Sequence, residues 1–271
     1  MTDEGGSRDG AAQGAGNTDV VGQAGDQRWK DHFSHASDDY RRWRPGYPAA
    51  LFGWLASEAP STELAWDCAT GNGQAAVALA KCFARVVATD ASAAQIRESE
   101  ACPRVEYLVA PAEKAPLEDA SVDLVTVAQA LHWFDITRFH AEVRRVLKPG
   151  GLVAEWGYQL GLVSDVIDPI VLHFSAVTVG PYWPPERALV EAGYSDVAFP
   201  FHSIEAPDFA MTACWELDRF VAYLGTWSSV AGYRRAVGND PLPALREELV
   251  PLWGSGAREI RWPLLLRVGM A

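Results

Sequence analysis

Basic residues are scarce in this chain of 271 residues, and that scarcity limits the partners it can have. Lysine and arginine together number 23 against 35 aspartates and glutamates, so the formal net charge is −12 and the pI is about 4.9. Binding to the phosphates of nucleic acid requires a basic surface. We therefore expect no nucleic-acid partner.

Long apolar runs and paired cysteines are also missing. No stretch reaches the roughly eighteen apolar residues that a membrane span needs, and the chain lacks the basic start and apolar run of a secretory signal. The four cysteines are scattered without a C-x-x-C pair, which favours reduced thiols in a cytoplasmic protein. Residues 1–27 are glycine-rich and acidic with few large apolar side chains, which predicts a disordered tail.

Histidines are few, and they do not form a metal-binding pattern. The spacing of His32 and His35 allows them to share a helix face, yet no third ligand lies nearby in the sequence. We expect no metal site.

Short apolar runs alternate with helical patterns between residues 64 and 156. The expected strands are residues 64–69, 85–90, 104–110, 122–130 and 151–156, with a helix over residues 73–83. This alternation predicts parallel pairing with helices on both faces of the sheet. The fold class is a doubly wound, mostly parallel α/β sheet.

Capping signals agree with the expected helices. Ser92 followed by Gln95 makes a capping box. Asp135 is placed to cap an amphipathic helix over residues 136–147, which Pro149, Gly150 and Gly151 should end before the next strand begins.

The flanking parts of the chain are less regular. After residue 156 we expect two further strands, residues 195–201 and 258–270, with aromatic-rich helices and loops before and between them. Before the sheet, residues 29–59 predict two helices separated by Pro45, Gly46 and Pro48.

A glycine turn follows the first strand and is compatible with two cofactors. Gly71, Gly73 and Ala76 satisfy the G-x-G-x-x-A pattern of dinucleotide-binding proteins, which is weak evidence alone. Asp67, at the carboxyl end of that strand, would repel a pyrophosphate but suits the ammonium and sulfonium of S-adenosylmethionine. Asp90 ends the second strand, where an acid accepts the ribose hydroxyls of either cofactor.

Four motifs, in this order and spacing, resemble the class I S-adenosylmethionine-dependent methyltransferases. They are DCATGNGQ, VVATDAS, APAEKAPLEDASVDLVTVAQALHWF and EVRRVLKPGG. The segment containing Phe33, Tyr40 and RPGYP, together with AQALHWFD, resembles the branch of trans-aconitate methyltransferase-like (methyltransferase type 11) enzymes. The resemblance implies a seven-stranded Rossmann-like sheet, N-terminal helices and a helical, aromatic cap in the C-terminal part.

The resemblance also implies a set of cofactor-binding residues for S-adenosylmethionine and its product S-adenosylhomocysteine. They are Tyr40, Arg44, Asp67, Ala69, Gly71, Gly73, Asp90, Ala91, Ala112, Glu113 and Gln129. Tyr40 and Arg44 would come from an N-terminal helix that closes over the site. Ala69 departs from the family pattern, which has glycine there, and alanine fits that position when its φ is negative.

The acceptor side of the site has weaker signals. His132, just past the fourth strand, is the candidate general base, which is needed only where the nucleophile is a hydroxyl. A packed or loop-bonded histidine is the alternative. Candidates to line an acceptor pocket are aromatic: Trp133, Tyr158, Tyr182, Trp183 and Trp227.

These observations predict a cytoplasmic methyltransferase acting on a small organic molecule, most readily at an oxygen. The alternatives are a non-catalytic S-adenosylmethionine-binding protein and a nicotinamide-dependent oxidoreductase. One methyltransferase domain is expected over residues 28–271. It comprises N-terminal helices (28–60), a cofactor-binding core (61–157), cap and substrate-side inserts (158–257) and a final strand (258–271).

Overall fold

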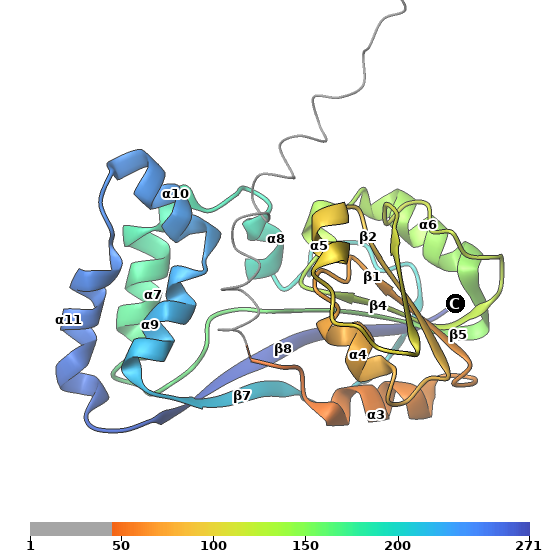
Figure 1. The fold of residues 1–271 in the computed structure, drawn as a ribbon, viewed down its shortest axis with the longest axis horizontal. Helices are drawn as coiled ribbons and strands as arrows, with labels where there is room; N and C mark the ends of the chain where they lie inside the picture. The colour runs from red at the N-terminus through yellow and green to blue at the C-terminus, as the bar shows by residue number, and fades with distance from the viewer. Residues whose placement is uncertain (1–44) are drawn as a thin grey trace, which may run out of the picture.

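The computed structural model describes residues 45–271, which form a mostly parallel sheet covered by helices (Figure 1). The sheet runs in the order β3-β2-β1-β4-β5-β8-β6, and β7 pairs with β8 alone. The strands are β1 (Leu64–Cys68), β2 (Arg85–Asp90), β3 (Val105–Val109), β4 (Val122–Ala128), β5 (Leu147–Tyr158), β6 (His202–Ile204), β7 (Ala210–Trp215) and β8 (Arg258–Met270). The first five pair in parallel and β8 is antiparallel to β5, so the expected Rossmann-like sheet is confirmed.

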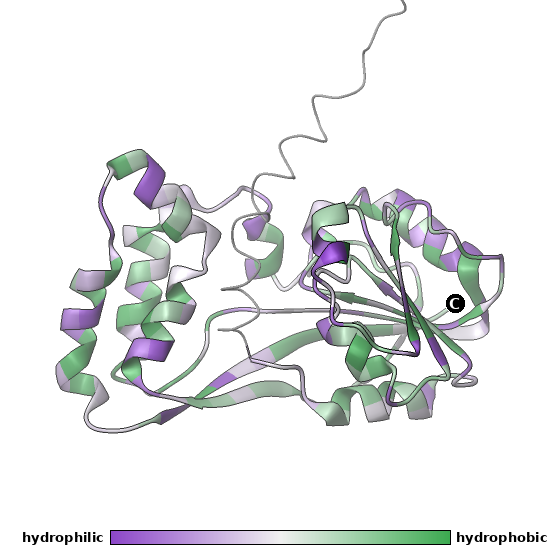
Figure 2. Ribbon diagram, in the orientation of Figure 1, coloured by the Kyte–Doolittle hydropathy of each residue, from purple (hydrophilic) through white to green (hydrophobic). Residues whose placement is uncertain are grey.

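Helices cover both faces of the parallel part of the sheet. They are α3 (Ala49–Glu58), α4 (Gln74–Leu79), α5 (Ala93–Arg97) and α6 (Ile136–Val146). Within β1, Ala65 packs in one core with α3 and α4, whereas the next residue, Trp66, packs in another with α6. Because successive side chains of a strand point to opposite faces, a sheet buried on both sides needs continuous apolar runs. Strands β1, β2 and β4 are buried along nearly their whole length. In Figure 2 green occurs both on the strands of the sheet and on the helices.

The cap is built on a two-stranded ribbon formed by β7 and the first half of β8. Its helices are α7 (Asp168–His173), a π-helical turn (Phe174–Thr178), a 3-10 turn (Gly180–Tyr182), α9 (Leu217–Gly225), α10 (Ser228–Val237) and α11 (Leu242–Trp253). They enclose an aromatic core of their own that includes Trp215, Tyr223, Trp253 and Trp262. In Figure 1 the cap lies to the left of the sheet, and α8 (Arg187–Glu191) lies between the two.

The strand expected at residues 195–201 is wrong. This segment is irregular, and its backbone carbonyls bind arginine side chains in place of a neighbouring strand. Arg267 donates to the carbonyl oxygen of Val197 at 2.9 Å, and Arg144 donates to that of Pro200. Pro200 itself has no N–H for a strand ladder, so the paired strand β6 begins only at His202.

The start of β5 is also earlier than expected. The strand begins at Leu147, directly after α6, and Pro149, Gly150 and Gly151 lie within it. The register with β4 shifts between the pairs Val122–Leu147 and Leu124–Leu152, so these residues form an irregularity in the strand in place of a turn before it.

The first part of the chain is described only from Pro45 onward. The second of the two N-terminal helices is confirmed as α3. The first helix, the tail over residues 1–27, Tyr40 and Arg44 all lie outside the described residues. Among residues 45–271, no helix has both the length and the apolarity to cross a bilayer.

Candidate functional site

Two buried carboxylates lie at the carboxyl ends of β1 and β2. Asp67 is 1% exposed; its two oxygens accept hydrogen bonds from the hydroxyls of Thr126 at 2.7 Å and Thr70 at 2.5 Å. Asp90 accepts from the backbone N–H groups of Gly71 at 3.0 Å and Ser92 at 2.8 Å. Asp90 thereby ties the glycine turn after β1 to the end of β2.

Burial opposes the ionisation of both carboxylates. Burial raises the pKa of Asp67 to about 6, with a smaller contribution from the charge of Asp90, while the bonds from Thr70, Thr126 and the Ala76 backbone oppose the rise. Burial also raises the pKa of Asp90. Within residues 45–271 neither makes an ion pair with a basic side chain. The site therefore holds two acids whose charge no described cation balances.

The glycine turn uses left-handed backbone at three alternate residues. The φ angles are +52° at Ala69, +58° at Gly71 and +89° at Gly73. A Cβ on Gly73 would lie 2.2 Å from the Tyr107 hydroxyl oxygen, so a side chain there would require the Tyr107 ring to move. The condition under which alanine fits the first position, a negative φ, is not met, because the turn imposes the left-handed conformation on Ala69 as well.

We expect Ala69→Gly to stabilise the protein. A left-handed conformation costs an L-residue about 1–2 kcal/mol that glycine avoids, and part of the gain is lost to the greater entropy of the unfolded chain. The net increase in the free energy of unfolding, measured by urea denaturation, should be up to about 1 kcal/mol. Ala91→Gly is the control. Ala91 is exposed and has no positive φ, so glycine there should be destabilising.

The segment after β3 brings Ala112 and Glu113 to the same edge. Ala112 is buried in the core beneath α6, and a Glu113 carboxylate oxygen accepts from the backbone N–H of Asp135 at 3.0 Å. Asp135 caps α6 as expected, and Ser92 likewise accepts from the Gln95 backbone N–H at the start of α5. Glu113 thus binds the start of α6 through one of its carboxylate oxygens.

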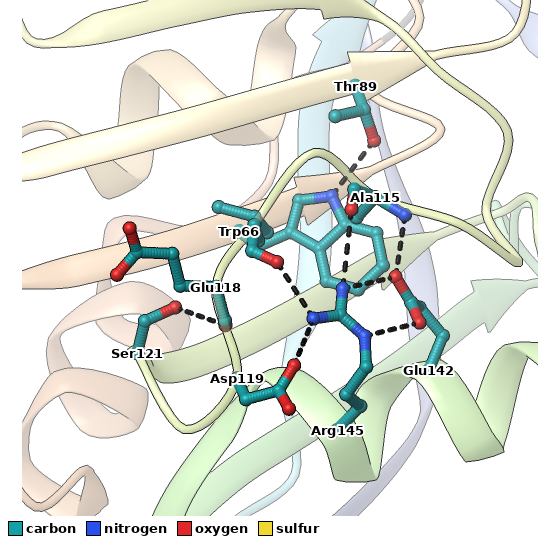
Figure 3. Close-up of polar contacts among 9 residues, drawn as sticks. Trp66, Thr89, Ala115, Glu118, Asp119, Ser121, Glu142 and Arg145 are labelled. Atoms are coloured by element: carbon teal, nitrogen blue, oxygen red, sulfur yellow. Dashed lines mark hydrogen bonds and ion pairs between the residues drawn. The ribbon is translucent and has the colours of Figure 1, made fainter.

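Arg145 of α6 anchors this segment from behind (Figure 3). It binds both oxygens of Glu142, at 2.7 and 2.9 Å, and reaches the Asp119 carboxylate at 2.6 Å. It also donates to the carbonyl oxygens of Leu117 and Ala115, while Glu142 accepts from the Ala115 N–H at 2.7 Å. Such a charged network fixes a loop that has no strand neighbour.

Gln129, the first residue after β4, has its side-chain amide engaged with the backbone of β5. Its Oε1 accepts from the Tyr158 N–H at 2.9 Å and its Nε2 donates to the Tyr158 carbonyl at 3.1 Å. Its φ is +57°. The amide therefore extends the β4–β5 ladder by one step, and this bond fixes the position of the chain at the end of β4.

His132 lies in a 3-10 turn (Leu131–Trp133) that follows β4. Its Nδ1 is 3.1 Å from the hydroxyl oxygen of Tyr194, and its ring lies 4.8 Å from that of Trp133. Burial and, to a smaller extent, the charge of Arg187 lower the pKa of His132 to about 4. The imidazole is therefore neutral at physiological pH and is a weak base.

The sequence analysis did not predict Tyr194 or Arg187 as site residues. They lie some sixty residues beyond His132 and reach it only because α8 packs against the 3-10 turn. The EAGYSD pattern around Tyr194 indicates a helix end and nothing more.

The predicted pocket aromatics fall into three groups. Trp183 and Trp227 contact each other, with ring centroids 5.5 Å apart, and the Arg187 guanidinium lies 4.6 Å over the Trp183 ring. Tyr158 is buried in the cap core, and Tyr182 contacts Tyr233 at 5.3 Å. Trp133 lies beside His132 at the sheet edge. Trp183 and Trp133 are therefore the two that lie nearest the polar groups, through Arg187 and His132.

Metal ligands are not clustered in the described part of the chain. No group of three or more His, Cys, Asp or Glu residues there is arranged to hold a metal ion.

Comparison with known proteins gives matches to the sheet and to most of the chain. A family model described as a methyltransferase domain matches residues 66–154. A Dictyostelium discoideum protein named as a methyltransferase is 34% identical over 227 residues, covering 82% of this chain and 86% of its own. A Saccharomyces cerevisiae protein named as an S-adenosylmethionine-dependent methyltransferase is 30% identical over 241 residues, covering 76% and 83%. The solved structure of a type II methyltransferase from Anaeromyxobacter dehalogenans has a TM-score of 0.80 at 45% identity, covering 84% and 97%.

Proposed function

The chain belongs to the S-adenosylmethionine-dependent methyltransferases, and from that premise we propose that it methylates a small organic acceptor at an oxygen. The observation that carries the choice of cofactor is the pair of buried carboxylates, Asp67 and Asp90, which no described basic side chain balances. A ligand with a sulfonium and an ammonium would supply the missing positive charge. A dinucleotide would bring a pyrophosphate, and its negative charge would add to theirs.

Each residue at this edge has a role suited to that cofactor. The Asp90 carboxylate, already oriented by two backbone N–H groups, would accept the ribose hydroxyls, and Asp67 would face the cationic methionine half. The small turn residues Ala69, Gly71 and Gly73 would let the backbone approach the methionine half of the cofactor. Three further residues would lie near the adenine: Ala91, Ala112 and Glu113. Gln129 would line the methionine half with its backbone. Tyr40 and Arg44, outside the described residues, stay predictions of a covering helix.

The cofactor, when bound, supplies an electrophilic methyl group whose departure leaves a neutral thioether. The protein's contribution is then orientation and exclusion of water. The aromatic cap supports a small acceptor, because Trp183 packs on the buried Trp227 at the edge of an apolar core adjoining α8. We also place the protein in the cytoplasm, which the four free cysteines support.

Calorimetric titration tests the proposal. We expect the full-length protein to bind S-adenosylmethionine and S-adenosylhomocysteine but not NAD. Asp90→Ala removes an acceptor for charged hydrogen bonds to the ribose, so both affinities should fall by about 10- to 100-fold.

Glu106→Gln is the matched control, because Glu106 is an exposed acid on β3 that pairs with Arg85. Its affinities should equal those of the wild type. Binding of NAD in place of the two adenosyl compounds would contradict the proposal. Binding of S-adenosylmethionine and S-adenosylhomocysteine, without methyl transfer to any acceptor in a broad screen, would favour the non-catalytic alternative.

A further inference from the structure

Three polar side chains lie on segments that pack together where the sheet edge adjoins the cap, since α8 contacts the 3-10 turn after β4. His132 is on the turn after β4, Arg187 begins α8, and Tyr194 follows α8. The Arg187 charge lies close enough to act on both of the others: it contributes to the lowered pKa of His132 and opposes the raised pKa of Tyr194. None of the three is used by the cofactor contacts proposed above.

The hydrogen bond between Tyr194 and His132 sets which imidazole nitrogen carries the proton. Tyr194 is 1% exposed, and burial raises the pKa of its phenol well above the usual value, so the hydroxyl keeps its hydrogen. A buried hydroxyl must donate that hydrogen, and Nδ1 of His132 is the acceptor at 3.1 Å. In a neutral imidazole an accepting Nδ1 leaves the proton on Nε2. His132 therefore offers an N–H donor at Nε2.

Arg187 has unused hydrogen-bonding capacity. Its guanidinium lies over the Trp183 ring, and its one carboxylate contact is from Nε to Glu191 at 3.4 Å. Among the residues that the structure describes, its two terminal nitrogens make no hydrogen bond, although the side chain is only 17% exposed. Arg145 and Arg267, by contrast, each bind several oxygens. A planar guanidinium with free nitrogens and an aromatic platform is suited to a carboxylate.

We propose that His132 and Arg187 bind a carboxylate of the methyl acceptor, with Tyr194 as the positioning residue that keeps Nε2 of His132 a donor. One positive charge and one neutral donor match a singly charged carboxylate better than a phosphate dianion, particularly in a protein of net charge −12. This inference rests on the proposed function and adds its substrate class. It assigns His132 to recognition of the acceptor in place of a base, and the carboxylate is a recognition handle.

The first test measures the imidazole directly. Nitrogen-15 NMR of the histidine rings, with His132 assigned by His132→Gln, should show the Nε2–H tautomer in the wild type near neutral pH. Tyr194→Phe should shift His132 toward the other tautomer. Tyr223→Phe is the control: it removes another buried hydroxyl, which accepts from Trp262 at 3.0 Å in the cap, and should leave His132 unchanged. An Nδ1–H tautomer in the wild type would overturn the donor role.

The second test measures anion binding on protein saturated with S-adenosylhomocysteine. Acetate, benzoate and succinate are the probes, benzamide is the neutral control, and the His132 ring resonances are the readout. We expect a saturable shift with at least one carboxylate and none with benzamide. Arg187→Gln should weaken that binding by about tenfold or more, whereas Arg246→Gln, an exposed cap arginine paired with Asp218, should not.

The outcomes separate this inference from the function on which it rests. Failure of S-adenosylhomocysteine to bind would reject the proposed cofactor site. Suppose that S-adenosylhomocysteine binds. If no carboxylate then shifts the His132 ring resonances, or if Arg187→Gln leaves the carboxylate affinity unchanged, the acceptor inference alone is overturned.

Discussion

Asp67→Asn is expected to stabilise the ligand-free protein while weakening its binding of S-adenosylmethionine. Burial raises the pKa of Asp67 from 3.8 to about 6, so the folded state takes up a proton more readily than the unfolded state. The stabilising contribution of this group is full below the unfolded pKa and is lost as the pH rises through about 6. Near neutral pH its ionisation therefore costs about 2–3 kcal/mol of folding free energy.

Asparagine avoids that cost and keeps the local bonds. Its amide oxygen accepts from one of the hydroxyls of Thr70 and Thr126, and its NH₂ donates to the oxygen of the other. Urea denaturation of the ligand-free protein should show the increase in unfolding free energy at about pH 7.5 and little increase near pH 4. The wild-type affinity for S-adenosylmethionine should fall by up to about tenfold per pH unit below about 6, and the variant should lack this dependence.

Asp123→Asn is the matched control with the opposite sign. Asp123 is a fully buried acid of β4, but it pairs with the Lys148 ammonium at 2.9 Å and accepts from the backbone N–H of Leu64 at 2.9 Å. Burial raises its pKa, yet these bonds and that of Ser61 outweigh burial and lower it overall. Its contribution to stability is therefore present at neutral pH and lost on acidification. If Asp67→Asn destabilises the protein as Asp123→Asn should, Asp67 is not an uncompensated charge.

The parallel half of the fold and its acids could be predicted because the information is local. Residues 85–90 form β2 as expected, because a buried strand needs an unbroken apolar run and a polar residue ends it. In a parallel sheet the ends of consecutive strands meet at one edge, so Asp67 and Asp90 are neighbours for a reason that the sequence contains. Residues 258–270 were likewise predicted as the strand that β8 forms.

The grouping of His132, Arg187 and Tyr194 could not be predicted, because it depends on packing between distant segments. No spacing rule relates Arg187 or Tyr194 to His132, and their meeting requires α8 to lie against the turn after β4. The same holds for the cap: β7 has the sequence AMTACW, in which small residues separate Met211 from Trp215 and the strand pattern is weak. Its pairing with β8 creates the strand. At residues 195–201 the segment is irregular, yet the alternate apolar residues Val197, Phe199 and Phe201 pack against the core. A half-buried strand would show the same alternation.

Glu155→Leu is expected to cause the largest loss of stability. Glu155, fully buried in β5, accepts from His140 of α6 at 2.6 Å and from Arg267 of β8 at 2.7 Å. Leucine would leave Arg267, whose side chain is 18% exposed, as a partly buried charge without its acid. The Nε atom of Arg267 already lacks a partner among the described residues. Breaking one side of a buried ion pair costs about 3–5 kcal/mol, which urea denaturation would measure.

The double variant Glu155→Leu/Arg267→Met decides whether the pair itself carries that cost. Removing both charges leaves no unpaired charge. The double variant should therefore lose less unfolding free energy than the two single variants lose together, by a coupling of about 0.5–3 kcal/mol. Arg267 also donates to the Tyr194 carbonyl at 3.0 Å. The backbone of Tyr194 is in the left-handed conformation, with a φ of +57°. Every variant that lacks Arg267 should therefore loosen the phenol and shift the His132 tautomer, even where stability is partly restored. Additive costs with an unchanged tautomer would mean that the buried network and the acceptor side are independent.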